Sequence, residues 1–293
     1  MILSFIVLIR IFSNAITNVY QKKLIKKIIN PFLINFLVSL IVSIFCILLL
    51  NINLVDNLNS KFWLYSILSG VFNSLGNGFL IKSLQNGELS VLVPINSYKP
   101  LIALFINVFF LKEFVNLISL LGLLFILIGS YFVINNSNTS NNKISSHLKT
   151  KSILYRILAL IFTAIEAVVI KEMIINSSIL QSLFFWSIFG AIFSFILFLI
   201  TFKKDFKTFN KLIINKTNII NLIYLAIFFG IMQLSTNYIF SKLNVGLALS
   251  LFQLSILLSL FFGYKYFNEK INLKKIFGTV IMITGAIIII LLA

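Results

Sequence analysis

The chain has 293 residues, of which 60% are hydrophobic and only 11% are charged, and its formal net charge is +17. A mean hydropathy of +1.07 excludes an ordinary water-soluble domain and indicates an integral membrane protein. Lys and Arg lie mainly between apolar runs and do not form one basic, aromatic-interleaved face, which argues against a nucleic-acid partner.

Apolar stretches of about 20 residues, each able to cross roughly 30 Å of hydrocarbon as a helix, recur along the chain. There are ten, at approximately 2–21, 30–50, 62–82, 89–111, 115–134, 153–172, 179–202, 219–241, 246–267 and 272–292. Backbone groups in lipid must be satisfied within each segment, and the alternation typical of a membrane barrel does not occur. We therefore predict an all-α integral membrane protein with ten transmembrane helices, embedded in the cell membrane as a multi-pass protein.

The first and third stretches each carry polar residues on one helical face. Arg10 and Asn14 share such a face in 2–21, and Asn73 and Asn77 lie one turn apart in 62–82. Placing an Arg or Lys at mid-span costs about 3 kcal/mol on insertion scales, so such residues persist where they are paired, hydrated or functional.

The fourth stretch contains VPINSYKP, residues 93–100. Pro100 has no N–H for the carbonyl of Asn96, so we expect the helix to open beside Lys99. We predict that Lys99 faces a cavity and contacts substrate, with Asn96 nearby. The alternatives are that Lys99 or Arg10 forms a buried structural pair with Glu166, or that Lys99 snorkels to the membrane surface.

A polar segment, NNSNTSNNKISSHLKTKS at 135–152, divides the chain into two similar halves, 1–134 and 153–293. Residues 109–134 align with 265–290 without a gap, and 70–84 align with 230–244. The matched pairs are Glu113/Glu269, Gly122/Gly278, Gly129/Gly285, Asn73/Gln233 and Asn77/Asn237. Five spans per repeat is an odd number, so we predict two inverted five-helix repeats. The glycines are expected at close-packed helix contacts, and the two glutamates at span ends.

Two stretches carry the family resemblance, "VPINSYKPLIALFINVFFLKEFVNLISLLGLLFILIGSYFV" and its second copy "LSLFQLSILLSLFFGYKYFNEKINLKKIFGTVIMITGAIII". With the five-plus-five duplication they resemble the ten-helix, EamA-like members of the drug/metabolite transporter superfamily. The second copy lacks the proline, and LKE and NEK stand where the family usually has a glycine before the glutamate. The resemblance implies a central cavity surrounded by spans 1, 3, 4, 6, 8 and 9. This chain has its polar faces on those spans, whereas spans 2, 7 and 10 are almost featureless.

The second half supplies the remaining candidates, which are Glu166 in the sixth span, Gln233 and Asn237 in the eighth, and Gln253 in the ninth. Arg10, Lys99 and Glu166 have no charged counterpart in the other half. A symmetric frame with asymmetric charges suits an asymmetric polar substrate. A carboxylate held away from water can also bind a proton near neutral pH, so Glu166 is a candidate group for proton coupling.

The sequence shows no nucleotide-binding loop and no nucleophile with a base, and Cys46 and His147 are each the only residue of their type. We therefore predict no enzyme, no metal and no cofactor. The predicted function is a secondary transporter that moves a small polar metabolite, such as an amino acid or related zwitterion, by alternating access. Alternatives are an organic or phosphorylated anion as substrate, a lipid-carrier flippase, and a non-transporting membrane scaffold.

Basic residues concentrate in the connections that follow odd-numbered spans, among them Lys22, Lys23, Lys26 and Arg156. The positive-inside rule places these connections in the cytoplasm and both termini outside it. Members of the resembling family usually have both termini inside.

Overall fold

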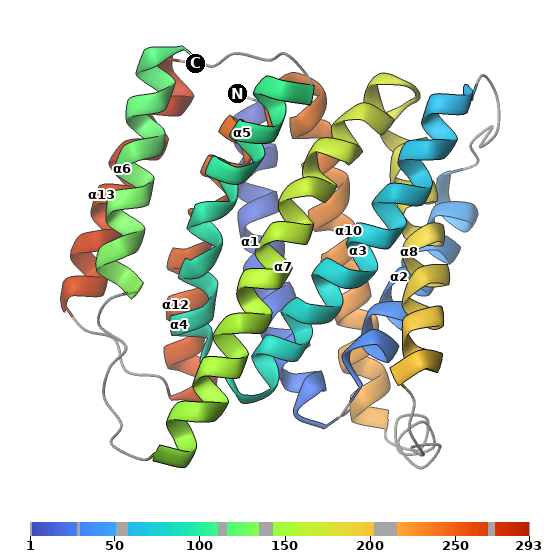
Figure 1. Cartoon of the computed structure of the whole chain (residues 1–293), viewed down its shortest axis with the longest axis horizontal. Helices are drawn as coiled ribbons and strands as arrows, with labels where there is room; N and C mark the ends of the chain where they lie inside the picture. The colour runs from blue at the N-terminus through green and yellow to red at the C-terminus, as the bar shows by residue number, and fades with distance from the viewer. Residues whose placement is uncertain are drawn as a thin grey trace.

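The computed structural model describes residues 2–27, 30–50, 58–110, 116–134, 143–201, 216–268 and 273–292. Every regular element within these ranges is helical (Figure 1). The helices are α1 Ile2–Ile25, α2 Pro31–Leu50, α3 Ser60–Asn86, α4 Leu89–Ile95, the 3₁₀ helix η1 Asn96–Tyr98, α5 Lys99–Phe110, α6 Leu117–Ile134, α7 Lys143–Ile175, α8 Ile179–Thr201, α10 Lys216–Lys242, α11 Val245–Phe252, α12 Ser255–Phe267 and α13 Leu273–Leu292.

Among the described residues, seven segments are long and apolar enough to cross a membrane, with α11 and α12 together forming one of them. The helices α6 and α13 contain shorter apolar cores, Leu120–Phe132 and Ile276–Gly285. The consecutive segments α4, η1 and α5 form the remaining pass. The predicted all-helical membrane fold is confirmed, and the chain termini lie at the same end of the bundle, as an even number of passes requires (Figure 1).

The fourth pass is broken where the sequence predicts. The helix narrows to the 3₁₀ segment at Asn96, and the backbone N–H of Lys99 bonds to the carbonyl of Asn96 before α5 continues through Pro100. The ninth pass is also broken, between α11 and α12, although it has no proline. The side chain of Gln253 donates to the carbonyl of Leu249 at 2.7 Å, and the backbone N–H of Gln253 bonds instead to Ser250 at 3.0 Å. A side-chain amide thus takes the carbonyl that a continuous helix would use.

The two halves interlock, because the most extensive helix contacts join elements from opposite halves: α3 with α7, α6 with α13, α2 with α8, and α1 with α10. The α6 and α13 pair stands at one side of the bundle (Figure 1). Helix α7 begins at Lys143, inside the predicted polar linker and ten residues before the predicted span. Hydropathy cannot detect a polar helical turn that extends beyond the hydrocarbon.

The predicted close packing of the paired glycines is confirmed, and it is reciprocal. A Cβ atom on Gly129 would collide with the carbonyl oxygen of Gly278, and one on Gly285 would collide with the carbonyl oxygen of Gly122. Small residues let the backbones of α6 and α13 approach closely, as in other membrane helix pairs. Glu113 and Glu269 lie outside the described residues.

Arg156 does not lie in a connection between spans, so its assignment to the basic connections of the sequence analysis is wrong. Helix α7 carries it into the packed interior, where its side chain is 0% exposed and its Nε donates to the carbonyl of Leu92 at 2.9 Å. Leu92 lies in the last turn of α4, so this cation sits at the negative end of a short helix and stabilises it electrostatically.

Candidate functional site

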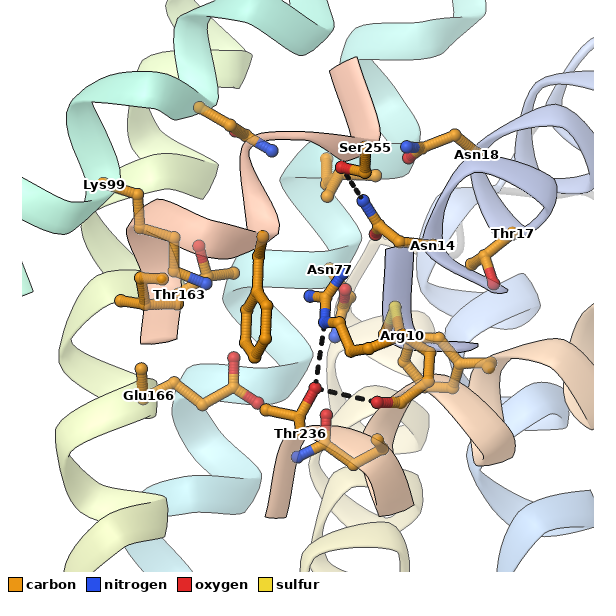
Figure 2. A pocket seen from close by; sticks show the side chains of 18 of the residues that line it. Arg10, Asn14, Thr17, Asn18, Asn77, Lys99, Thr163, Glu166, Thr236 and Ser255 are labelled. Atoms are coloured by element: carbon orange, nitrogen blue, oxygen red, sulfur yellow. Dashed lines mark hydrogen bonds between the residues drawn. The ribbon is translucent and has the colours of Figure 1, made fainter. Parts of the chain in front are cut away.

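A cavity lies between the two broken passes and is bordered by α1, α3, α7, α8 and α10 (Figure 2). Its empty volume is about 870 Å³ with its open side included. The sequence-predicted site residues that line it are Arg10, Asn14, Asn77, Asn96, Lys99, Glu166, Gln233 and Gln253. Residues from both halves therefore meet in one polar cavity.

Three charged side chains from three helices line this cavity. Lys99 begins α5, Glu166 lies on α7 and Arg10 lies on α1 (Figure 2). Lys99 and Glu166 attract each other electrostatically. Among the described residues, however, neither cation forms an ion pair with a carboxylate within 4.0 Å. The described residues therefore do not show the closed structural pair considered from the sequence.

Arg10 is held by contacts on two sides. Its Nε donates to the hydroxyl of Thr236 at 3.1 Å, and the guanidinium carbon lies 4.1 Å from the ring centroid of Phe252. The side chain is only 9% exposed, and one terminal nitrogen, Nη1, has no hydrogen-bond partner among the described residues. A buried donor without a partner is costly, so a ligand acceptor at this nitrogen would be stabilised.

Glu166 is held by an aromatic residue that sequence reasoning missed. The indole N–H of Trp186 donates to Oε1 of Glu166 at 2.7 Å, and the indole packs against Phe229 with ring centroids 5.4 Å apart. Trp186 belongs to α8, so the seventh span, which is almost featureless in the sequence, also contributes to the cavity wall. The sequence alone does not separate this tryptophan from one that faces lipid, but once it is buried its N–H needs a partner.

Asn73 and Asn237 do not line the cavity but lie behind residues that do. The side-chain amide of Asn77 donates to Oδ1 of Asn73 at 2.9 Å, and that of Gln233 donates to Oδ1 of Asn237 at 3.0 Å. Position 77 faces the cavity in the first half, whereas the second half uses 233, the counterpart of 73. In each repeated amide pair one residue lines the cavity, but it is the second residue of the pair in the first half and the first residue of the pair in the second half.

The second span is also not featureless, because Asn35 of α2 reinforces this inner layer. Its side-chain amide donates to Asn73 at 3.3 Å and to the hydroxyl of Ser194 on α8 at 2.8 Å. These bonds link α2, α3 and α8 behind the cavity. They explain how a polar residue in an apolar span is satisfied without water.

Asn14 connects the two halves at the rim of the cavity. Its amide donates to the hydroxyl of Ser255 at 2.7 Å (Figure 2). Ser255 begins α12 and is the repeat counterpart of Lys99, which begins α5. One broken pass therefore presents an ammonium group to the cavity, and the other presents a hydroxyl that is already bonded to α1.

We expect Trp186→Phe to weaken ligand binding while leaving the fold intact. The phenyl ring preserves most of the packing against Phe229 but cannot donate to Glu166. A hydrogen bond to a charged group contributes about 1.5–3 kcal/mol, so a ligand that depends on the orientation of Glu166 should bind roughly tenfold more weakly. Trp63→Phe is the matched control, because Trp63 contacts Phe62 and Phe185 and lies outside the cavity wall. Equal dissociation constants for the two variants would contradict this role.

An inverted-repeat helical bundle with a central polar cavity between discontinuous helices is an architecture of secondary transporters. The chain belongs to the EamA-like transporter family, whose model matches residues 1–135 and 150–291. This places it among membrane transporters of the drug/metabolite transporter type.

Two further proteins are similar to this chain. A solved crystal structure superimposes with a TM-score of 0.73 over 99% of this chain and 97% of that chain, at 14% sequence identity, so it shares the fold. An uncharacterized protein of Methanocaldococcus jannaschii is 33% identical over 90 residues, which is 29% of this chain and 64% of that relative. The match thus spans less than two thirds of the relative's length.

Proposed function

We propose that this protein is a secondary transporter of a small polar zwitterion, such as an amino acid, working by alternating access. The observation that carries the proposal is the cavity itself, in which Lys99, Arg10 and Glu166 face a common space without forming a closed ion pair. Two cations and one carboxylate on different walls match a molecule that bears opposite charges at separate atoms.

The binding geometry assigns each end of the ligand to one wall. The ligand carboxylate lies between Lys99 and Arg10, where the guanidinium can donate to two oxygens. The ligand ammonium lies at Glu166, whose Oε2 is not needed for the bond to Trp186. The amides of Asn77 and Gln233 remain for the other polar atoms of the ligand.

The breaks in the fourth and ninth passes divide each of these passes into two half-helices that can move separately. The half-helices α4 and α5 are joined by the 3₁₀ helix η1, and α11 and α12 are joined by a turn at 253–254 with i→i−3 hydrogen bonds. Both joints can change angle without unfolding either half-helix. Arg10 contacts α11 from the first half, and Arg156 contacts α4 from the second. Exchange of these cross-half contacts is our proposed basis for alternating access.

An organic or phosphorylated anion is the second candidate substrate. It is favoured by the excess of cations in the cavity and by the bond that already engages Glu166 with Trp186. For such a substrate, Glu166 would serve as a proton-binding group or a positioning residue, and not as a ligand for a substrate ammonium. Proton coupling through Glu166 belongs to this proposal in either case.

Thermal unfolding of the detergent-solubilised protein with amino acids, organic acids, phosphates and hydrophobic cations tests the proposal. A ligand at 100 times its dissociation constant should raise the free energy of unfolding by about 2.7 kcal/mol. We expect amino acids to raise the midpoint of native unfolding and Lys99→Gln to lose that shift. Lys61→Gln is the control, because Lys61 is exposed at the start of α3. An equal shift in Lys99→Gln would remove Lys99 from the site, and stabilisation by organic acids or phosphates alone would favour the second candidate.

A further inference from the structure

A cluster of lysines and aromatic rings forms where α1 and α12 end together. The ammonium groups of Lys22 and Lys26 lie 4.4 and 5.3 Å from the ring centroid of Phe267. Those of Lys23 and Lys265 lie 4.9 and 5.8 Å from the ring centroid of Tyr266. We call these six residues the lysine–aromatic cluster. It lies outside the central cavity and is independent of the transport proposal.

Three lysines of the cluster bring positive charges close together. Lys23, Lys26 and Lys265 form no ion pair within 4.0 Å with any carboxylate among the described residues. The ring faces and the carbonyl ends of α1 and α12 offset part of the repulsion between the ammonium groups. An anion placed between the ammonium groups would offset the rest.

The cluster lies at the depth of lipid headgroups. Helix α1 has 24 residues and is therefore about 36 Å long, more than the roughly 30 Å hydrocarbon thickness. Its last turn carries Lys22 and Lys23, so this is the end expected to emerge from the hydrocarbon. Tyr20 and Tyr224 stack at this end with centroids 5.6 Å apart, and Tyr266 is 50% exposed. Tyrosines at this depth are typical of the membrane interface.

We propose that the lysine–aromatic cluster binds the phosphate of an anionic phospholipid headgroup. Lys23 and Lys265 approach the phosphate from the two helices, and the exposed edge of Tyr266 packs against the glycerol and the first methylenes of the acyl chains. Basic residues beside a membrane span attract anionic lipids, which are enriched in the cytoplasmic leaflet. The cluster lies at the end of the bundle opposite the termini, which is the end that the charge count from the sequence assigns to the cytoplasm.

The test uses the full-length protein in a neutral detergent with dioctanoyl phosphatidylglycerol, dioctanoyl phosphatidylcholine or inorganic phosphate as the probe. We expect phosphatidylglycerol to bind and raise the unfolding midpoint, and the other two probes to do neither at the same concentration. The double variant Lys23→Gln/Lys265→Gln should bind phosphatidylglycerol at least about tenfold more weakly, since each lysine near an anionic lipid accounts for a factor of roughly five.

Lys216→Gln/Lys274→Gln is the matched control, because both lysines are exposed at the same end of the bundle and outside the cluster. It should bind phosphatidylglycerol within about twofold of the native chain, and Lys23→Arg/Lys265→Arg should retain binding. Unfolding midpoints without lipid verify that each variant is folded. The proposal is overturned if both double Gln variants lose binding equally, if the lipids bind equally well, or if inorganic phosphate binds as tightly as phosphatidylglycerol.

Discussion

Replacing Gly285 by alanine should lower the free energy of unfolding by about 1–3 kcal/mol, and leucine should lower it further or prevent assembly. The new Cβ would meet the carbonyl oxygen of Gly122 and the Cβ of Phe125, so α6 and α13 would have to separate. None of the described glycines has a positive φ, and the loss therefore reflects contact between helices and not backbone strain. The measurement is the unfolding midpoint in detergent.

Gly230→Ala is the matched control for that experiment. A Cβ at Gly230 would lie 3.6 Å from Val42, an ordinary van der Waals distance. Alanine favours a helix interior over glycine by roughly 0.5–1 kcal/mol, so this variant should be neutral or slightly more stable. If alanine at 230 and at 285 lowered the midpoint equally, the α6 and α13 contact would not be the reason.

Replacing Glu166 by glutamine should separate the two candidate substrate classes. The amide oxygen can still accept the indole N–H of Trp186, so the wall of the cavity should keep its shape. A zwitterion would lose the charged partner of its ammonium and bind at least about tenfold more weakly, since a hydrogen bond to a charged group contributes about 1.5–3 kcal/mol. An anion would meet Lys99 and Arg10 without the opposing carboxylate and should bind as tightly or more tightly.

Binding constants for one amino acid and one dicarboxylate, measured on the same preparations, decide between these outcomes. Glu172→Gln is the control, because Glu172 lies on the same helix outside the cavity and accepts a bond from Asn176 at 3.4 Å. If the Glu166→Gln variant bound both ligands with the same dissociation constants as the native chain, neither substrate class would contact this carboxylate.

The number of passes and the charged part of the site were predictable because both follow from the cost of placing polar groups in hydrocarbon. A run of about 20 apolar residues has few alternatives to a membrane helix, and Arg10, Lys99 and Glu166 are too costly to face lipid. Pro100 likewise predicts the break in the fourth pass, because it has no N–H to continue the helix. In each case the physical reason lies within a single segment of the chain.

The features that the sequence did not reveal depend on contacts between segments. Trp186 and Phe252 sit in apolar runs, where an aromatic ring that faces a cavity reads the same as one that faces lipid. The break in the ninth pass depends on a hydrogen bond from the side-chain amide of Gln253 to the carbonyl of Leu249. Many glutamines in helices do not form such a bond. Arg156 was assigned to a connection because it lies only three residues into the predicted span 153–172, and its burial depends on a contact with α4 that the sequence does not show.

The interlocking of the two halves has a consequence for biogenesis. Helices enter the membrane in the order of synthesis, but α1, α2, α3 and α6 find their main partners only in the second half. Until the second half has been synthesised, the glycine face of α6 and the amides of α3 lack their final partners and face lipid or a chaperone. The contact between α6 and α13 therefore forms only after α13 has been made.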